Sequence, residues 1–155
     1  MADSALPIRR NAAGIIDTGT VWLLQKRDDK DGIMWPGKVA LWGGAMESTD
    51  ESDYLRNMMR ELTEETGLGE VDVELTCFGS ATLVHQTMHG ELVRQETKLF
   101  VARLKHPVAV HVYEGAALYE LDPATELIDT TEFAPNVLDA LEKLKLFYRE
   151  QAGGR

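Results

Sequence analysis

The segment from Gly43 to Gly67, GGAMESTDESDYLRNMMRELTEETG, constrains the fold more than any other part of the chain. Its apolar residues recur at the spacing of one helix face: Leu55, Met58, Met59 and Leu62. A glycine pair precedes this face, and a single glycine follows it. The pattern predicts a helix from Leu55 to Thr66 that packs its apolar face on a sheet.

The same segment concentrates negative charge on a neighbouring face of the predicted helix. Glu61, Glu64 and Glu65 stand at i, i+3 and i+4, where like charges repel one another. A solvated acidic surface would tolerate this repulsion, and that reading stays open. However, a glycine pair allows close approach of a ligand to the backbone, and three carboxylates are the hard oxygen ligands that Mg²⁺ or Mn²⁺ prefers. The pattern therefore favours a metal site.

The rest of the chain predicts several strands and one more helix. Strands are expected at 12–16, 21–26, 74–85, 96–104 and 116–121, with a hairpin turn at Thr18-Gly19. The apolar residues that follow Pro135 have helical spacing: Val137, Leu138, Leu141, Leu144 and Tyr148. This order predicts an α/β fold, a mixed sheet with a helix on each side. The 155 residues form one predicted domain, with residues 1–10 and 151–155 expected to be flexible.

Composition limits the partners and the location. The net charge of −10 disfavours polymeric nucleic acid and anionic membranes, and a phosphate substrate would need cations as mediators. The N-terminus lacks the apolar block of a signal peptide, so a cytoplasmic location is expected. The single cysteine, Cys77, lies in the run VELTCFGSATLV and is expected to be buried.

The stretch from Arg60 to Leu68, RELTEETGL, resembles the second half of the Nudix box, whose pattern is G-x5-E-x7-R-E-U-x-E-E-x-G-U with U apolar. The flanking runs AAGIIDTGTVWLLQKR, PGKVALWGGAME, YEGAALYELDPATEL and FAPNVLDALEKL also resemble segments of Nudix hydrolases. Most of the chain is covered by this resemblance. It implies a Nudix-type α/β/α sandwich.

The first half of the motif departs from the pattern. The expected glutamate falls on Ser52, and the spacing is two residues longer than the pattern, which places an insertion of two residues after Glu47. Glu51 is the nearest substitute, and Asp50 is the next. Alternatively, Ser48-Thr49-Asp50-Glu51 is a capping box, in which Glu51 serves the helix end and no metal.

The resemblance implies hydrolysis of a nucleoside diphosphate linked to another moiety, by attack of water on phosphorus, with Mg²⁺ or Mn²⁺ as cofactor. The metal ligands it implies are the Gly44 carbonyl, Glu51, Glu61, Glu64, Glu65 and Glu114. One of the glutamates would be the base, so the implied catalytic residues are Glu61, Glu64, Glu114 and Arg60, which would orient a carboxylate. Arg27 and Gly43 would contact the substrate.

Several alternatives stay open from the sequence. The domain could bind a nucleotide and regulate without cleaving it. An isopentenyl-diphosphate isomerase has the same fold, but Cys77 is a poor catalytic cysteine. Glu96 could supply the remote carboxylate in place of Glu114, and Trp35 or Trp42 could stack on a base or pack in the core. The substrate and a homodimeric state are not decided.

Overall fold

The computed structural model of the protein describes residues 5–113, 115, 117–127 and 129–153. Its strands are β1 (Ile8–Asp17), β2 (Trp22–Lys26), β3 (Val39–Ala40), β4 (Trp42–Ala45), β5 (Val73–Gln86), β6 (Leu92–Leu104) and β7 (Ala117–Leu121). The helices are α1 (Tyr54–Thr66) and α2 (Val137–Gly153), and the short 3-10 helix η2 (Ser48–Asp50) precedes α1. Within the described residues, no helix has the length and apolar character needed to cross a membrane.

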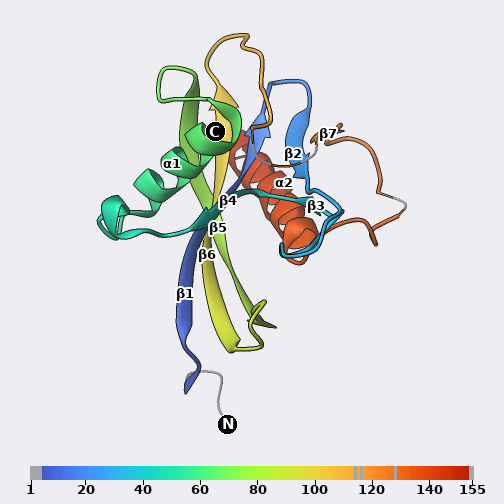
Figure 1. The fold of residues 1–155 in the computed structure, drawn as a ribbon. Helices are drawn as coiled ribbons and strands as arrows, with labels where there is room; N and C mark the ends of the chain where they lie inside the picture. The colour runs from blue at the N-terminus through green and yellow to red at the C-terminus, as the bar shows by residue number, and fades with distance from the viewer. Residues whose placement is uncertain (1–4, 114, 116, 128, 154–155) are drawn as a thin grey trace.

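The strands form one mixed sheet in the order β3-β2-β1-β6-β5, with β4 paired to β1 and β7 paired to β2. The central strand β1 is antiparallel to β2 and β4 but parallel to β6. Beyond the helices, β1, β5 and β6 extend together as a long arm (Figure 1). The mixed sheet and the hairpin between β1 and β2 confirm the sequence prediction.

Each face of the sheet carries one apolar cluster and one helix. Met58 and Leu62 of α1 are fully buried against Ala12 and Ile16 of β1. On the other face, α2 packs over Ile15 in a separate cluster. Side chains of a strand alternate between its two faces, which explains why neighbouring residues of β1 belong to different clusters. The prediction of a helix on each side is confirmed.

The ends of α1 follow local rules that the sequence displays. The Asp53 carboxylate accepts a hydrogen bond from the Leu55 N–H at 2.9 Å and caps the first turn. Gly67 ends the helix with φ of 77°. The prediction that Leu55 belongs to the buried face is wrong, because this side chain is 49% exposed. The buried face is centred on Met58 and Leu62 instead, and Leu55 lies on the solvent-facing side of the first turn of α1.

Two further expectations are corrected by the strands. Cys77 is exposed on the edge strand β5, not buried. A register shift between Cys77 and Gly79 interrupts the alternation of the strand, so that Leu75 and Ala81, which regular alternation would place on one face, pack in different clusters, and the cysteine between them faces solvent. The chain ends are also more regular than expected, because residues 8–10 pair with β6 and residues 151–153 continue α2.

The glycine pair on β4 permits two close approaches. Gly43 has φ of 128°, and a Cβ at this position would collide with the carbonyl oxygen of Ala12. A Cβ at Gly44 would lie 2.6 Å from a carboxylate oxygen of Glu61. The pair therefore allows β4 to lie directly against β1 and against the acidic face of α1.

Replacing Gly43 with alanine should lower the free energy of unfolding by about 2–4 kcal/mol, because the new Cβ meets backbone that cannot turn away. Urea denaturation followed by circular dichroism measures this change. Gly69→Ala is the matched control, since a Cβ there meets nothing within 4 Å. The control should change the free energy of unfolding by less than about 0.5 kcal/mol. Equal effects of the two substitutions would contradict the claim that the close approach of Gly43 to the Ala12 backbone requires glycine.

Candidate functional site

The guanidinium of Arg60 organises the acidic residues around the start of α1. Its Nε donates to Asp50 Oδ1 at 3.0 Å, and its Nη2 donates to Asp50 Oδ2 at 3.1 Å. Asp50 is buried, and Oδ2 also accepts the Glu47 N–H at 2.9 Å. Arg60, with the Glu47 N–H as a smaller contribution, holds the pKa of the Asp50 carboxyl below its usual value, and Asp50 raises the pKa of Arg60. This two-point ion pair fixes η2 to α1.

The remaining donors of Arg60 reach three further groups. Nη1 lies 3.1 Å from Glu61 Oε1 and 3.2 Å from Glu64 Oε2, and Nη2 donates to the Ala45 carbonyl at 3.0 Å. Glu47 lies at 3.6 Å from Nη1. The expected contact between Arg60 and a glutamate of the motif is thus present. The set contains four carboxylates and one guanidinium, so it keeps a surplus of negative charge.

The structure does not bring Glu51 into this group. Glu51 ends η2 in the left-handed conformation, with φ of 54°, and its exposed carboxylate pairs with Arg56 at 3.1 Å. Asp50, the second substitute for the shifted glutamate of the motif, lies beside Arg60 instead. The capping alternative is also corrected, because the residue that reaches back to a backbone N–H is Asp50.

Glu65 differs from the other glutamates of α1, because it is 4% exposed. Its Oε1 accepts the Gly43 N–H at 2.7 Å, and its Oε2 accepts from Gln25 Nε2 at 3.1 Å. Glu64, by contrast, has a side chain that is 47% exposed. Glu65 therefore joins α1 to β4 and β2, and this contact explains why an acidic residue faces the sheet.

The donor chemistry of the site fits a divalent cation. Carboxylate oxygens are the ligands such ions prefer, and the surplus charge around Arg60 is what a cation would neutralise. Gly44 leaves room beside the Glu61 carboxylate that a Cβ would fill. In the described part of the chain, no three acidic, histidine or cysteine side chains converge on one metal position. Arg60 holds Glu61 and Glu64 in this arrangement, so a cation would compete with the guanidinium for them.

Arg27 lies between two hollows of the surface. It lines a cavity of about 430 Å³ that includes Lys30, Glu65 and Tyr113. It also lines a second pocket on the α2 face, and its Nε donates to the Met34 carbonyl at 2.6 Å.

Glu114, which the sequence analysis placed in the site, lies outside the described residues. The Gly44 carbonyl, another expected ligand, lies 3.3 Å from Nδ2 of the buried Asn57.

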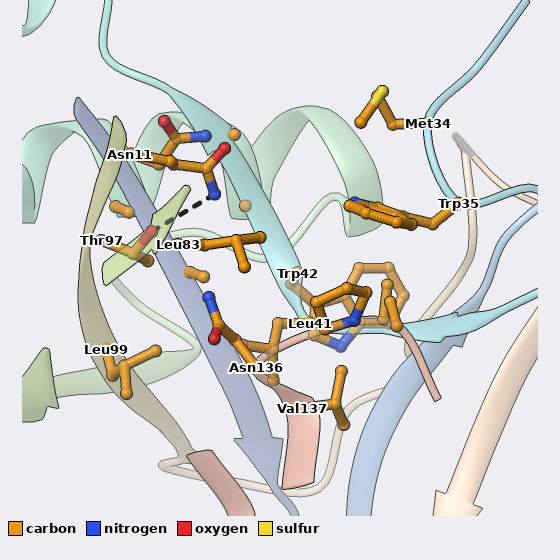
Figure 2. Close-up of a pocket in the computed structure, with 18 of the residues that line it drawn as sticks. Asn11, Met34, Trp35, Leu41, Trp42, Leu83, Thr97, Leu99, Asn136 and Val137 are labelled. Atoms are coloured by element: carbon orange, nitrogen blue, oxygen red, sulfur yellow. Dashed lines mark hydrogen bonds between the residues drawn. The ribbon is translucent and has the colours of Figure 1, made fainter. Parts of the chain in front are cut away.

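The second pocket has a volume of about 330 Å³ and adjoins Gly43 and Gly44. Figure 2 shows Asn11, Trp35 and Asn136 around this hollow, from β1, the β2–β3 loop and the residue before α2. Besides Arg27, its polar lining residues are Asn11, His85, Gln95, Thr97 and Asn136. This set could not be predicted from the sequence, because its members are far apart in the chain and no motif links them.

The tryptophans and Glu96 differ in their position relative to this pocket. Trp35 lines the pocket, with its ring centroid 6.3 Å from that of His85. Trp42 is fully buried, and its Nε1 donates to the Leu23 carbonyl, so its part in the pocket wall is structural. Trp22 is also buried. Glu96 pairs with Arg94 at 3.4 Å and is not among the residues that line the pocket.

The family model and the similar solved structures point to the same protein family. A family model described as NUDIX domain matches residues 7–151. No curated protein sequence matches the chain. Among solved structures, a MutT NUDIX hydrolase from Burkholderia pseudomallei is 19% identical with a TM-score of 0.68, and the alignment covers 88% of this chain and 98% of that one. An Ap4A hydrolase from C. elegans is 16% identical with a TM-score of 0.65, covering 93% and 98%.

A third similar structure is the NUDIX domain of Shewanella oneidensis NrtR in complex with ADP ribose. It is 16% identical with a TM-score of 0.63, and the alignment covers 92% of this chain and 88% of that one. At these identities the likeness of the three structures is a likeness of fold.

Asp50→Asn should lower the free energy of unfolding by about 2–4 kcal/mol near neutral pH, because it leaves Arg60 without its buried partner. Since the folded-state pKa of Asp50 is depressed, the contribution is present above the unfolded pKa of about 3.9 and is lost as pH falls through the folded pKa. The variant should therefore lose less stability than the wild type on acidification. Urea titrations from about pH 7 to about pH 2 measure this difference.

Glu51→Gln is the control for this ion pair, because it changes the neighbouring carboxylate that is exposed. It should shift the free energy of unfolding by less than about 0.5 kcal/mol. A larger loss of unfolding free energy for Glu51→Gln than for Asp50→Asn would contradict the role of Asp50 as the stabilising partner of Arg60.

Proposed function

The chain belongs to the NUDIX domain family, and from this premise we propose that it is a pyrophosphohydrolase of the Nudix type, which hydrolyses the diphosphate of a nucleoside derivative. The nucleoside would occupy the pocket on the α2 face. The diphosphate would lie at the glycine pair, beside Glu61 and Glu64 of α1. Water would attack phosphorus there.

One observation carries this proposal: Gly43 and Gly44 border both the pocket and the acidic face of α1. They line the pocket on one side. On the other side, Gly44 lies against the Glu61 carboxylate, and the Gly43 N–H donates to Glu65. A ligand that fills the pocket and reaches across this strand would therefore present its polar end to the carboxylates. Nucleoside diphosphates have this shape, with an organic ring at one end and anionic oxygens at the other.

We propose Mg²⁺ or Mn²⁺ as the cofactor, in keeping with the general use of divalent cations by Nudix hydrolases. Glu61 and Glu64 are the residues that would hold it, because Arg60 already gathers both and because Glu64 remains accessible to solvent. A divalent cation supplies activation of water and shielding of the phosphate charge. Glu65, Glu114 and the Gly44 carbonyl stay secondary candidates.

The chain's own residues would prepare the site for this chemistry. Arg60 fixes the positions of the Glu61 and Glu64 carboxylates, because its guanidinium is itself held by both oxygens of Asp50. Arg27 stands where both hollows meet and would contact phosphate oxygens. Glu61 or Glu64 would accept the proton of the attacking water on a carboxylate oxygen that the cation leaves free.

Glu61→Gln and Glu64→Gln should each lower kcat about 100-fold or more and weaken Mn²⁺ binding, because an amide keeps the shape of the side chain but binds a hard cation poorly. Turnover is measured by release of phosphate or nucleoside monophosphate from a nucleotide panel. Mn²⁺ affinity is measured by electron paramagnetic resonance of the free ion.

Glu70→Gln provides the matched control, since it removes the same charge from an exposed glutamate outside the cluster. It should keep wild-type turnover and Mn²⁺ affinity. Full activity of the wild type in excess chelator would refute the metal requirement. Wild-type turnover in both α1 variants would refute their role.

A further inference from the structure

Gln95 lies on the pocket-facing side of β6, within a short chain of hydrogen-bonding groups. Its Oε1 is 3.2 Å from Nε2 of His85, and its Nε2 donates to Thr97 Oγ1 at 3.4 Å. The bond to Thr97 is the dashed line in Figure 2. All three side chains line the pocket. The carboxamide is thus held from both ends, and its orientation is defined by its neighbours.

The orientation decides which group Gln95 offers to a ligand. The His85 ring faces an oxygen at each nitrogen, Gln95 Oε1 at 3.2 Å and the exposed Gln86 carbonyl at 3.3 Å. A carboxamide oxygen only accepts, so this hydrogen bond requires the ring to donate from Nε2 to Gln95 Oε1. One hydrogen of the Gln95 amide goes to Thr97. The second N–H remains for a ligand, because an amide nitrogen carries two donors.

We propose that Gln95 determines specificity by donating this N–H to a carbonyl oxygen on the ring of the bound nucleoside. The proposal rests on the proposed function, which places a nucleoside in this pocket. A base with an oxo group at the position read by Gln95 would be preferred over the same base with an amino group. His85 and Thr97 act as positioning residues, because they orient the carboxamide.

Asn11 and Asn136 also place carboxamides in the pocket lining, but Gln95 is the carboxamide that side-chain hydrogen bonds orient within the described residues. Of the described residues that line the pocket, only Arg27 carries a formal charge, and that side chain lies at the junction with the second cavity. Trp35 offers a ring face to any planar base and does not distinguish exocyclic groups. A donor that the bound ligand shields from water loses its hydrogen bond when it faces an amino group, whereas an oxo group satisfies it.

Two matched pairs of nucleotides test the proposal, each differing in one exocyclic group. Inosine diphosphate carries an oxo group where ADP carries an amino group, and UDP and CDP differ in the same way. Dissociation constants are measured by isothermal titration calorimetry with Ca²⁺ in place of Mg²⁺, because the diphosphate needs a cation beside the carboxylates. The wild type should bind the oxo member of at least one pair about tenfold more tightly. Gln95→Glu, which replaces the donors with acceptors, should remove or reverse that preference.

A second variant and a control separate recognition from folding. His85→Phe removes the ring nitrogens that orient Gln95, so the ratio of the two dissociation constants should move toward one, even if Gln95→Glu does not fold. Lys98→Gln changes the net charge by the same amount as Gln95→Glu, on the same strand but outside the pocket lining. It should keep the wild-type ratio.

The outcomes distinguish this inference from the proposed function. Equal binding of both members of each pair by the wild type, a preference for the amino members, or no binding of any of the four would overturn the role of Gln95. So would a wild-type ratio in both the Gln95→Glu and His85→Phe variants. If the ratio shifts as expected but no nucleotide is hydrolysed with Mg²⁺ or Mn²⁺, the specificity contact stands and the proposed function fails.

Discussion

The buried Glu65 carboxylate is the contact on which the position of α1 depends. Removing a carboxylate from water is costly unless its oxygens receive hydrogen bonds, and here the Gly43 N–H and Gln25 Nε2 provide them. The bonds connect the last turn of α1 to two strands of the sheet. They fix the rotation of the helix, and this rotation sets where Arg60 and Glu61 face. The order of the acidic site is therefore a consequence of a contact within the core.

Periodic and locally capped elements were predictable from the sequence. The spacing of Met58 and Leu62 identified α1, and Gly67 marked its end, because helix periodicity and left-handed termination are encoded within a few residues. The acidic motif also identified Arg60 and Glu61 as neighbours. These features were found because each depends on residues close together in sequence.

The errors and omissions depend on contacts that sequence spacing does not record. Glu51 was favoured by counting, but the left-handed turn at the end of η2 directs it to Arg56 and leaves Asp50 with Arg60. Cys77 was expected in the core, but a bulge in β5 exposes it. The pocket combines Asn11 and Gln95, which become neighbours only when β1 pairs with β6. Such pairing depends on tertiary contacts, and no local sequence pattern records it.

The parallel pairing of β1 with β6 also has a consequence for the order of folding. During synthesis β1 emerges first, yet Ile8 pairs with Arg94 and Asp17 with Arg103. The hairpin with β2 contributes only two paired positions of β1, Ile16 and Asp17. β4 pairs with four further positions of β1, Asn11 to Gly14, but the other edge of β1 stays unpaired until β6 has left the ribosome. Contacts so distant in sequence slow folding, and the interval is when this chain is most dependent on chaperones.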